Sequence, residues 1–337
     1  MFLPEFKTRL TQFENALRKH PEPFFRFAED GTAGLLFEQH VYQAGRFTTP
    51  SIGELKARLQ QRTQVVAAEL GLQRLGGHKA ERDIGHLQAS APSGTAFQVA
   101  SQFNCLEAPA LHLVPIAQYF NDPTQGPSAA ISAFPGAFLR RYQAPGAGGM
   151  HYQQTDRLGL NLLEDVLEGT GASVECGYLC TQHIPDPAAL ADALSERFEC
   201  LRVGLHEDVQ VVLGRHGAEP VTRDVRITQI FTSTIALGAF SRAHKDADFA
   251  PIRRALLKGA YLGTLLAALS IGAARIVLTQ IGGGVFCNPG KDIWDAINWA
   301  VDAARPYAGT PLEILVNCYS DPDSALAQAL PRRALPL

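Results

Sequence analysis

The chain has 337 residues, 46% of them hydrophobic and 19% charged, which is enough apolar side chain for one large domain with a sizeable core. Its formal net charge of −3 excludes a broadly basic surface, so we expect no nucleic-acid polymer as a partner. Residues 1–20 are charged and lack the apolar stretch of a Sec signal peptide, and the longest apolar run, 260–274, is too short to span a membrane. We therefore expect no membrane partner, and a protein that is cytoplasmic or exported without a Sec signal.

The first 62 residues predict a helical extension. Helical periodicity runs over 6–19 and 52–59, and Thr49 or Ser51 ahead of Glu54 gives the second helix a plausible N-terminal cap. Between the two helices, residues 35–42 are a strand candidate. No low-complexity linker follows, so we expect residues 1–62 to pack on a main domain that spans residues 63–337.

After residue 65, β-branched strand candidates alternate with helix candidates. Strands are expected over 97–102, 174–179, 209–213, 226–231, 275–280 and 312–316. Helices are expected over 127–134, 157–168, 187–196, 252–271 and 291–304. This alternation predicts an α/β fold with a mixed or mostly parallel sheet and helices on both faces. In such folds a ligand lies beyond the carboxyl ends of the strands.

A polar motif follows the strand expected at 97–102. Asn104 and Glu107 come directly after that strand. Further along, the run before a helix of small residues contains Asn121, Asp122, Thr124, Gln125 and Gly126. Amides and carboxylates on two strand-end loops suit a sugar with several hydroxyls and a bond to be hydrolysed. The alternative is structural, with Asp122 capping the helix that begins near Gly126 and Asn104 satisfying a turn.

The strongest motif runs from 275 to 297, where a buried strand leads into Gly282, Gly283 and Gly284, followed by Val285 and Phe286. Glycines permit positive φ and let backbone N–H groups approach an anion closely. Asn288 is a natural N-cap and Pro289 suits the first helical position, so a helix N-terminus lies beside the loop. Together they would form a diphosphate cradle. The alternative is a tight turn that needs glycine for steric reasons alone.

Two further candidates are weaker. His151 lies in a glycine-rich loop that is either a mobile lid or an ordinary surface loop. Cys287 sits near a helix N-terminus, which would lower the pKa of a thiol nucleophile, although a buried apolar cysteine is the usual alternative. The ten histidines show no metal-ligand spacing, so we expect no metal site and no cofactor.

Five segments, in this order, resemble the macrodomain superfamily: FQVASQFNCLE, NDPTQGPSAAI, RITQIFTST, LLKGAYLGTLLAAL and VLTQIGGGVFCN. They are most similar to the divergent branch that contains MavL-type bacterial effectors and related ADP-ribosylhydrolases, with poly(ADP-ribose) glycohydrolase more distant. The resemblance covers residues 97–319. It implies a three-layer α/β/α macrodomain-like fold that holds ADP-ribose in a cleft over its strand ends, in the chain's own cell or as an exported effector. It also implies an ADP-ribosylated protein as partner, with ubiquitin among the candidates.

By the same resemblance, residues 282–286 would wrap the diphosphate, residues 122–126 would border the distal ribose and Asn104 would face that ribose. The paired glutamates that follow the GGG loop of poly(ADP-ribose) glycohydrolase are missing. The expected function is an ADP-ribosylhydrolase in which water attacks the distal ribose. Asp122 is the first candidate for the catalytic carboxylate and Glu107 the second. The alternatives are a reader module that binds ADP-ribose without cleaving it, and a thiol enzyme that uses Cys287.

Overall fold

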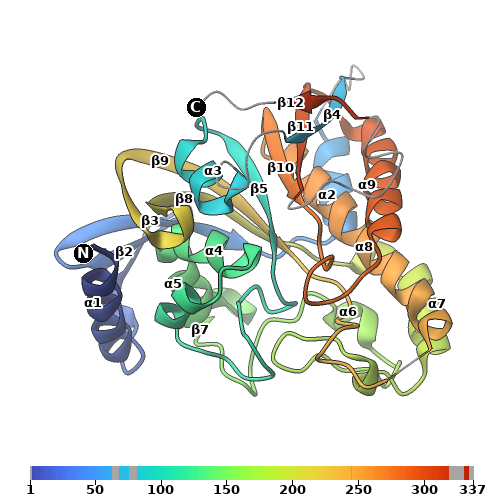
Figure 1. The fold of residues 1–337 in the computed structure, drawn as a ribbon, viewed down its shortest axis with the longest axis horizontal. Helices are drawn as coiled ribbons and strands as arrows, with labels where there is room; N and C mark the ends of the chain where they lie inside the picture. Colours follow the sequence, from blue (N-terminus) through green and yellow to red (C-terminus); the bar gives the residue numbers. More distant parts are fainter. Residues whose placement is uncertain (1, 63–67, 76–81, 244, 319–329, 334–337) are drawn as a thin grey trace.

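The computed structural model describes residues 2–62, 68–75, 82–243, 245–318 and 330–333. In these ranges a ten-stranded mixed sheet has the order β1-β2-β3-β8-β9-β5-β10-β11-β4-β12 (Figure 1). Its strands are β1 (Phe25–Phe27), β2 (Ala33–Phe37), β3 (His40–Thr48), β4 (Leu70–Leu75), β5 (Thr95–Ala100), β8 (Gly204–Gly214), β9 (Glu219–Thr232), β10 (Arg275–Thr279), β11 (Leu312–Asn317) and β12 (Arg332–Arg333). A separate ribbon pairs β6 (Ala144–Pro145) with β7 (His151–Tyr152).

Helices cover both faces of the sheet, so the fold is a three-layer α/β/α sandwich, as the sequence predicts (Figure 1). One face is covered by α3 (Ile84–Ser90), α4 (Gln125–Ser132) and α5 (Phe134–Tyr142), and the other by α2 (Ile52–Gln60), α8 (Asp246–Ser270) and α9 (Gly290–Ala304). α1 (Phe2–Leu17), α6 (Glu164–Leu167) and α7 (Pro187–Glu196) lie toward the periphery. No helix of the described residues combines the length and apolarity that crossing a membrane requires.

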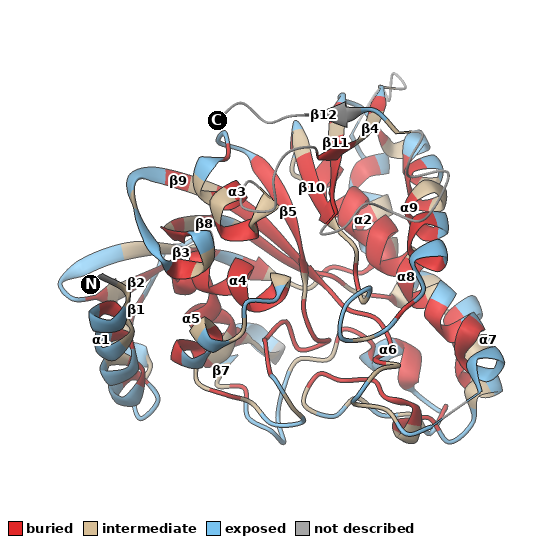
Figure 2. Cartoon of the chain, in the orientation of Figure 1, coloured by how far each residue is buried: buried red, intermediate tan, exposed pale blue. Residues whose placement is uncertain are grey.

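The central strands are buried on both faces, as expected of parallel strands under two helical layers (Figure 2). β5 runs parallel to β9 and to β10, and β10 runs parallel to β11. Their carboxyl ends therefore meet at one edge of the sheet. Directly beneath that edge lies the buried amide of Gln98, which bonds to the hydroxyls of Thr232 and Thr264 (3.2 and 3.0 Å) and accepts from the backbone N–H of Thr279 (3.2 Å). Gln98 thereby ties β5, β9, β10 and α8 together.

The N-terminal segment is not purely helical, although α1 and α2 are the two helices expected there. The predicted cap of α2 is present as a capping box, with Ser51 and Glu54 each bonding the other's backbone N–H. The single strand expected at 35–42 is instead a hairpin of β2 and β3, which turns at Glu38 and Gln39, both with positive φ. β3 pairs with β8, so this segment adds three strands to the sheet. The boundary expected between residues 62 and 63 falls next to residues 63–67, which lie outside the described ranges.

The strand predicted over 174–179 is wrong. The chain turns there at Cys176 and Gly177, both with positive φ, and a single bridge joins Glu175 to Tyr178. The turn is needed because the chain passes directly over Asn104, whose Oδ1 would lie 2.5 Å from a Cβ on Gly177.

The helix predicted over 157–168 shortens to the single turn of α6. Upstream of it, short polar side chains bond to nearby backbone N–H groups and compete with the helical pattern. Thr155 Oγ1 accepts from Leu158 N (3.0 Å), and Asn161 Oδ1 accepts from Leu163 N (3.0 Å). Apolar spacing alone could not reveal this competition.

Candidate functional site

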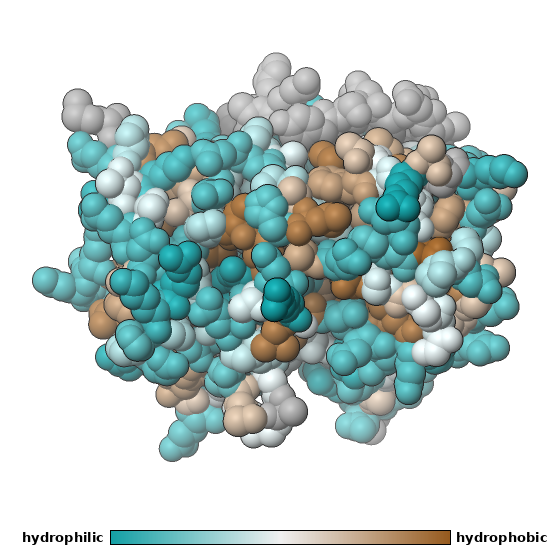
Figure 3. Space-filling model, turned by 90° about the horizontal axis from the view of Figure 1, so that it is seen from below, coloured by the Kyte–Doolittle hydropathy of each residue, from teal (hydrophilic) through white to brown (hydrophobic). Residues whose placement is uncertain are grey.

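A cavity of about 400 Å³, called the cleft below, opens beyond the carboxyl ends of β5, β9 and β10. Its volume is typical of small-molecule sites. Seen from the lower edge of Figure 1, apolar side chains gather near the middle of the molecule (Figure 3). The lining includes nine of the residues that the sequence singled out: Glu107, Asp122, Thr124, Gln125, Gly126, Gly282, Gly284, Val285 and Phe286.

Glu107 forms part of the inner wall, on the loop after β5. Its side chain is only 3% exposed, and its Oε1 atom is buried without a hydrogen-bond partner among the described residues. Gly126 makes room for it, because a Cβ there would lie 2.3 Å from Glu107 Oε2. Burial raises the pKa of Glu107 well above its usual range, and Asp122 adds to the rise, while Ser101 and Arg140 partly oppose it. Glu107 therefore keeps its proton to a higher pH than an exposed glutamate.

A buried guanidinium supports the loop that carries Glu107. Arg140 is 1% exposed, donates from Nε to the carbonyl of Cys105 (3.0 Å) and stacks 3.7 Å from the ring centroid of Phe231. It also bonds to His206 Nδ1 (2.8 Å), and burial lowers the pKa of His206, so that ring stays neutral and accepts. Burial lowers the pKa of Arg140 to about 10, which leaves it cationic at neutral pH and able to act on Glu107 through its charge.

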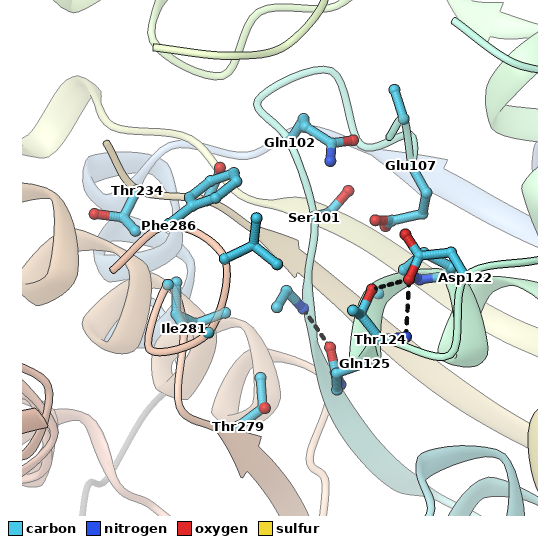
Figure 4. Close-up of a pocket in the computed structure, with 18 of the residues that line it drawn as sticks. Ser101, Gln102, Glu107, Asp122, Thr124, Gln125, Thr234, Thr279, Ile281 and Phe286 are labelled. Carbon is cyan, nitrogen blue, oxygen red and sulfur yellow. Dashed lines mark hydrogen bonds between the residues drawn. The ribbon is translucent and has the colours of Figure 1, made fainter. Parts of the chain in front are cut away.

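Asp122 lies at the C-terminal end of the 3-10 helix η3 (Ile116–Asn121), and its carboxylate and that of Glu107 point toward one another (Figure 4). Its Oδ1 accepts from the backbone N–H of Thr124 (2.9 Å) and from the Thr124 hydroxyl (2.6 Å). Asp122 therefore orders the turn that leads into α4, as the capping alternative foresaw in part. It is also half-buried in the cleft wall, so a structural role and a chemical role are compatible.

Gln125 and Gly126 begin α4 at the same wall. The Gln125 side chain bridges the end of β5, accepting from Ala100 N (2.7 Å) and donating to Gln98 O (3.0 Å). Both polar atoms of this amide are thus engaged with backbone, although the side chain lines the cleft. Gln125 fixes the position of α4 against the sheet.

The glycine loop after β10 forms the opposite wall. It is closed by backbone bonds from Gly283 N to Gln280 O (3.0 Å) and from Cys287 N to Gly284 O (3.0 Å). Only Gly282 of the three glycines has positive φ, at +71°. Among the residues that the structure describes, the N–H groups of Gly282, Gly284, Val285 and Phe286 have no acceptor. A run of unpaired N–H groups on a loop that lines a cavity suits an anion.

Two residues of this motif differ from expectation. Gly283 does not line the cleft, because a Cβ on it would point toward α9 and lie 3.0 Å from Ile293 Cδ1. Asn288 does not cap α9, whose N-cap is Pro289. Its buried amide nitrogen donates to three carbonyl oxygens, those of Ile235 (3.0 Å), Gly282 (3.3 Å) and Phe286 (3.3 Å). Asn288 thus holds the loop in shape from behind.

Two predicted asparagines lie outside the cleft. Asn104 is buried behind it, and its Oδ1 accepts from Leu106 N (3.1 Å), so the turn alternative describes it. Asn121 is exposed on the outer surface, where it accepts from Lys7 Nζ (2.5 Å). The resemblance that placed Asn104 against a distal ribose therefore finds no support in this geometry.

Several residues that line the cleft were not predicted from the sequence. Gln102 Oε1 and Ser233 Oγ line the cleft and, like Glu107 Oε1, are buried without a hydrogen-bond partner among the described residues. Buried polar atoms are nearly always bonded, so three unpaired oxygens in one cavity indicate a polar ligand. Both residues lie at the carboxyl ends of strands that the sequence predicts, and this position could have identified them as lining residues.

An aromatic trio of Tyr178, Phe240 and Phe286 lines one part of the cleft. Ring centroids lie 4.6 Å apart for Tyr178 and Phe240, 5.7 Å for Tyr178 and Phe286, and 6.3 Å for Phe240 and Phe286. The Tyr178 hydroxyl donates to Ala108 O and accepts from Gln102 Nε2 (3.2 Å). These rings come from three distant segments, so no local pattern could have predicted them together.

The weaker candidates lie elsewhere. Cys287 is exposed and does not line the cleft, so the thiol alternative loses its position. His151 stacks on Phe27 with centroids 4.4 Å apart, and it lines a second cavity with Met150 and Leu158. In the described part of the chain, no three His, Cys, Asp or Glu residues are grouped so that they could hold a metal ion.

No protein-family model matches the chain, and no curated protein matches it. Among solved structures, the chain is similar to a poly(ADP-ribose) glycohydrolase from Thermomonospora curvata, with a TM-score of 0.48 and 14% identity over 95% of this chain and 96% of that one. It is also similar to a poly(ADP-ribose) glycohydrolase from Deinococcus radiodurans in complex with ADP-ribose, with a TM-score of 0.47 and 14% identity over 80% and 86%. Similarity at this level does not establish a function, which has to be inferred from the residues of the site itself.

Proposed function

We propose that this protein is an ADP-ribosylhydrolase, which releases ADP-ribose from a modified protein. The observation that carries the proposal is the placement of Glu107. It is a buried carboxyl group with one unpaired oxygen, it faces Asp122, and it lies across the cleft from the glycine loop. Two carboxyl groups with different environments at one cavity are the usual requirement for cleaving a glycosidic bond.

The cleft supplies a place for each part of the ligand. The unpaired N–H groups of Gly284, Val285 and Phe286 would bind the diphosphate without any lysine or arginine. The aromatic trio offers ring faces and edges against which adenine or a ribose can pack. Gln102 Oε1 and Ser233 Oγ are free to bond ribose hydroxyls, which would satisfy both ligand and protein.

The chemistry follows from the different surroundings of the two carboxyl groups. A water oxygen attacks the anomeric carbon of the distal ribose as the bond from that carbon to the protein-linked atom breaks. Glu107, whose pKa is raised by burial, donates its proton to the departing atom. The half-buried carboxylate of Asp122 accepts the proton of the water and stabilises the positive charge that develops on the sugar. The products are free ADP-ribose and the unmodified side chain.

The resemblance of the sequence motifs to MavL-type ADP-ribosylhydrolases makes ADP-ribosylated ubiquitin the first substrate to test. Calorimetry measures binding of free ADP-ribose, and mass spectrometry of the incubated protein measures its release. We expect both. Binding without release from any ADP-ribosylated protein would make the chain the reader module, and absence of binding would overturn the whole proposal.

Asp122→Asn tests the base assignment. Asparagine keeps an Oδ1 acceptor for Thr124 and removes the charge, so we expect the single-turnover rate to fall about a hundred- to ten-thousand-fold with little change in ADP-ribose affinity. Asp186→Asn is the matched control, because Asp186 caps α7 with the same kind of bonds away from the cleft. A folded Asp122→Asn protein that cleaves at the normal rate would make this aspartate purely structural.

A further inference from the structure

The N-terminal helix α1 contacts an element that is connected to both carboxyl groups of the cleft. That element is η3. Its C-terminal end is followed by Asp122, and the hydroxyl of Tyr119, within it, accepts from the backbone N–H of Glu107 (2.9 Å). The position of η3 therefore sets where both carboxyl groups lie. Its own N-cap is Pro115, which provides no side-chain cap.

Glu14 of α1 provides the missing cap. Its carboxylate is 2% exposed and accepts from two backbone N–H groups at the start of η3, those of Ile116 (2.6 Å) and Ala117 (2.9 Å). The hydroxyl of Tyr142 on α5 donates to the same carboxylate (2.7 Å). A buried carboxylate is costly unless it is well bonded, and here three donors come from two parts of the chain more than a hundred residues away.

Two more contacts continue along the same helix. The ring of Phe6 packs edge-on against Phe120 of η3, with centroids 6.4 Å apart. Lys7 Nζ donates to Asn121 Oδ1 (2.5 Å), immediately before Asp122. α1 thus contacts η3 at its beginning and at its end.

We propose that Glu14 is a positioning residue for the hydrolysis, holding η3 so that Glu107 and Asp122 stay together at one wall of the cleft, beside the bound sugar. This inference rests on the proposed function. A displacement of η3 would move both carboxyl groups relative to the substrate. The glycine loop and the aromatic trio, to which the proposed function assigns the diphosphate and the adenosine, belong to other segments of the chain.

The test is Glu14→Gln, compared with Phe13→Leu on the neighbouring position of α1. Glutamine keeps the volume but replaces one of the two carboxylate oxygens with an NH₂ group, which cannot accept from the N–H groups of η3. The ring contacts of Phe13 are with Phe24, Phe37 and Phe138, none of which belongs to η3. For Glu14→Gln we expect kcat to fall on the order of ten- to a hundred-fold, with KM and the ADP-ribose Kd within about threefold of wild type. For Phe13→Leu we expect a lower Tm and an unchanged kcat.

Amide hydrogen exchange gives a second readout that needs no turnover. Ile116 and Ala117 should exchange faster in Glu14→Gln, while the amides of α8 keep their protection. Tyr142→Phe removes one of the three hydrogen bonds to Glu14, so it should lower kcat and speed amide exchange as Glu14→Gln does, but by a smaller factor. It replaces Glu14→Gln as the test if that variant does not fold.

The outcomes separate the two proposals. Wild-type protein that releases no ADP-ribose would overturn the proposed function, and the exchange data would still decide whether Glu14 holds η3. Active wild type with an equally active, folded Glu14→Gln protein would overturn the positioning role. An equal loss of kcat in Phe13→Leu would do the same, because it would reduce the effect to general destabilisation of α1.

Discussion

At the scale of single residues, the site depends on two carboxyl groups in unlike surroundings. Glu107 is enclosed by Gly126, the loop after β5 and the buried Arg140, while Asp122 is half-buried and bonded to Thr124. Desolvation has the larger effect on Glu107, so its pKa rises despite the nearby cation. In the proposed mechanism, this difference in burial makes Glu107 the acid.

Replacing Glu107 with Gln should reduce single-turnover cleavage about a hundred- to ten-thousand-fold, because the amide cannot donate the proton.

The same substitution should change how the stability of the protein depends on pH. The pKa of Glu107 is higher in the folded protein than in the unfolded chain, where it is about 4.3. Glu107 therefore stabilises the wild type fully below about pH 4.3, and this contribution is lost as the pH rises through the folded-state pKa. Glutamine does not titrate, so the Tm of Glu107→Gln relative to wild type should be higher at about pH 8 than at about pH 5. If the Tm of Glu107→Gln minus that of wild type falls between about pH 5 and about pH 8, the assignment of Glu107 as the buried acid is contradicted.

Gly284 is the position at which to test the glycine loop. It lines the cleft and a Cβ there meets no atom within 4 Å, so Gly284→Glu should fold normally and place a negative charge where the diphosphate would bind. We expect calorimetry to show at least an about tenfold weaker ADP-ribose affinity, from blocked access and charge repulsion.

Gly290→Glu is its matched control. It adds the same charge at the first residue of α9, in open space outside the cleft, where an acidic side chain is favourable. Affinity that is equal in the two variants and the wild type would exclude this loop as the anion site. Gly283 would be a poor choice, because its substituent would press on Ile293.

At the scale of elements, the cleft floor depends on how firmly β5, β9 and β10 are joined at their carboxyl ends. Gln98→Met would keep the volume but leave the Thr232 hydroxyl and the Thr279 N–H without their buried partner. We expect urea unfolding to report a loss of roughly 2–4 kcal/mol, since each unsatisfied buried group costs about 1–3 kcal/mol.

Gln210→Met is the comparison for that loss. Gln210 is half-buried on β8 and makes one bond, to Gln43 N (2.9 Å), so its replacement should cost less than about 1 kcal/mol. Equal losses at the two positions would show that Gln98 is an ordinary polar contact and not a hub of the sheet.

The elements that lead into the cleft could be predicted because their signals are local. β5, β9 and β10 overlap the β-branched runs expected over 97–102, 226–231 and 275–280, and α9 follows its amphipathic pattern. The glycine loop could also be predicted, because its three glycines are consecutive in the sequence. These segments and the loops that follow them account for Glu107 and for the wall formed by the glycine loop.

The parts that could not be predicted depend on contacts between distant segments. Tyr178 belongs to a segment whose apolar pattern favoured a strand, yet packing over Asn104 forces a turn. Arg140 lies on α5, where an arginine would ordinarily be taken as exposed, and only the fold shows that it is buried against the loop that carries Glu107. Glu14 reads as one more polar residue of an amphipathic helix until η3 is placed against it.

At the scale of the whole molecule, the residues that line the cleft lie between residues 100 and 286. We expect EDTA to leave both the ADP-ribose Kd and the turnover rate unchanged within about twofold, because the diphosphate site consists of backbone N–H groups and the acid is Glu107. Calorimetry and a release assay, each with and without EDTA, check this. Loss of both activities in EDTA, with recovery on adding a divalent cation, would show that the cradle is incomplete.

The pairing of β3 with β8 has a consequence for how the chain is made. The partners Arg46 and Glu207 are 161 residues apart, so the hairpin of β2 and β3 leaves the ribosome long before the strand that covers its edge. Until then it presents an unpaired strand edge, and α1 must wait similarly for η3. Such long-range pairings slow folding and expose the growing chain to aggregation. Recombinant yield should therefore respond strongly to lower growth temperature and to co-expressed chaperones.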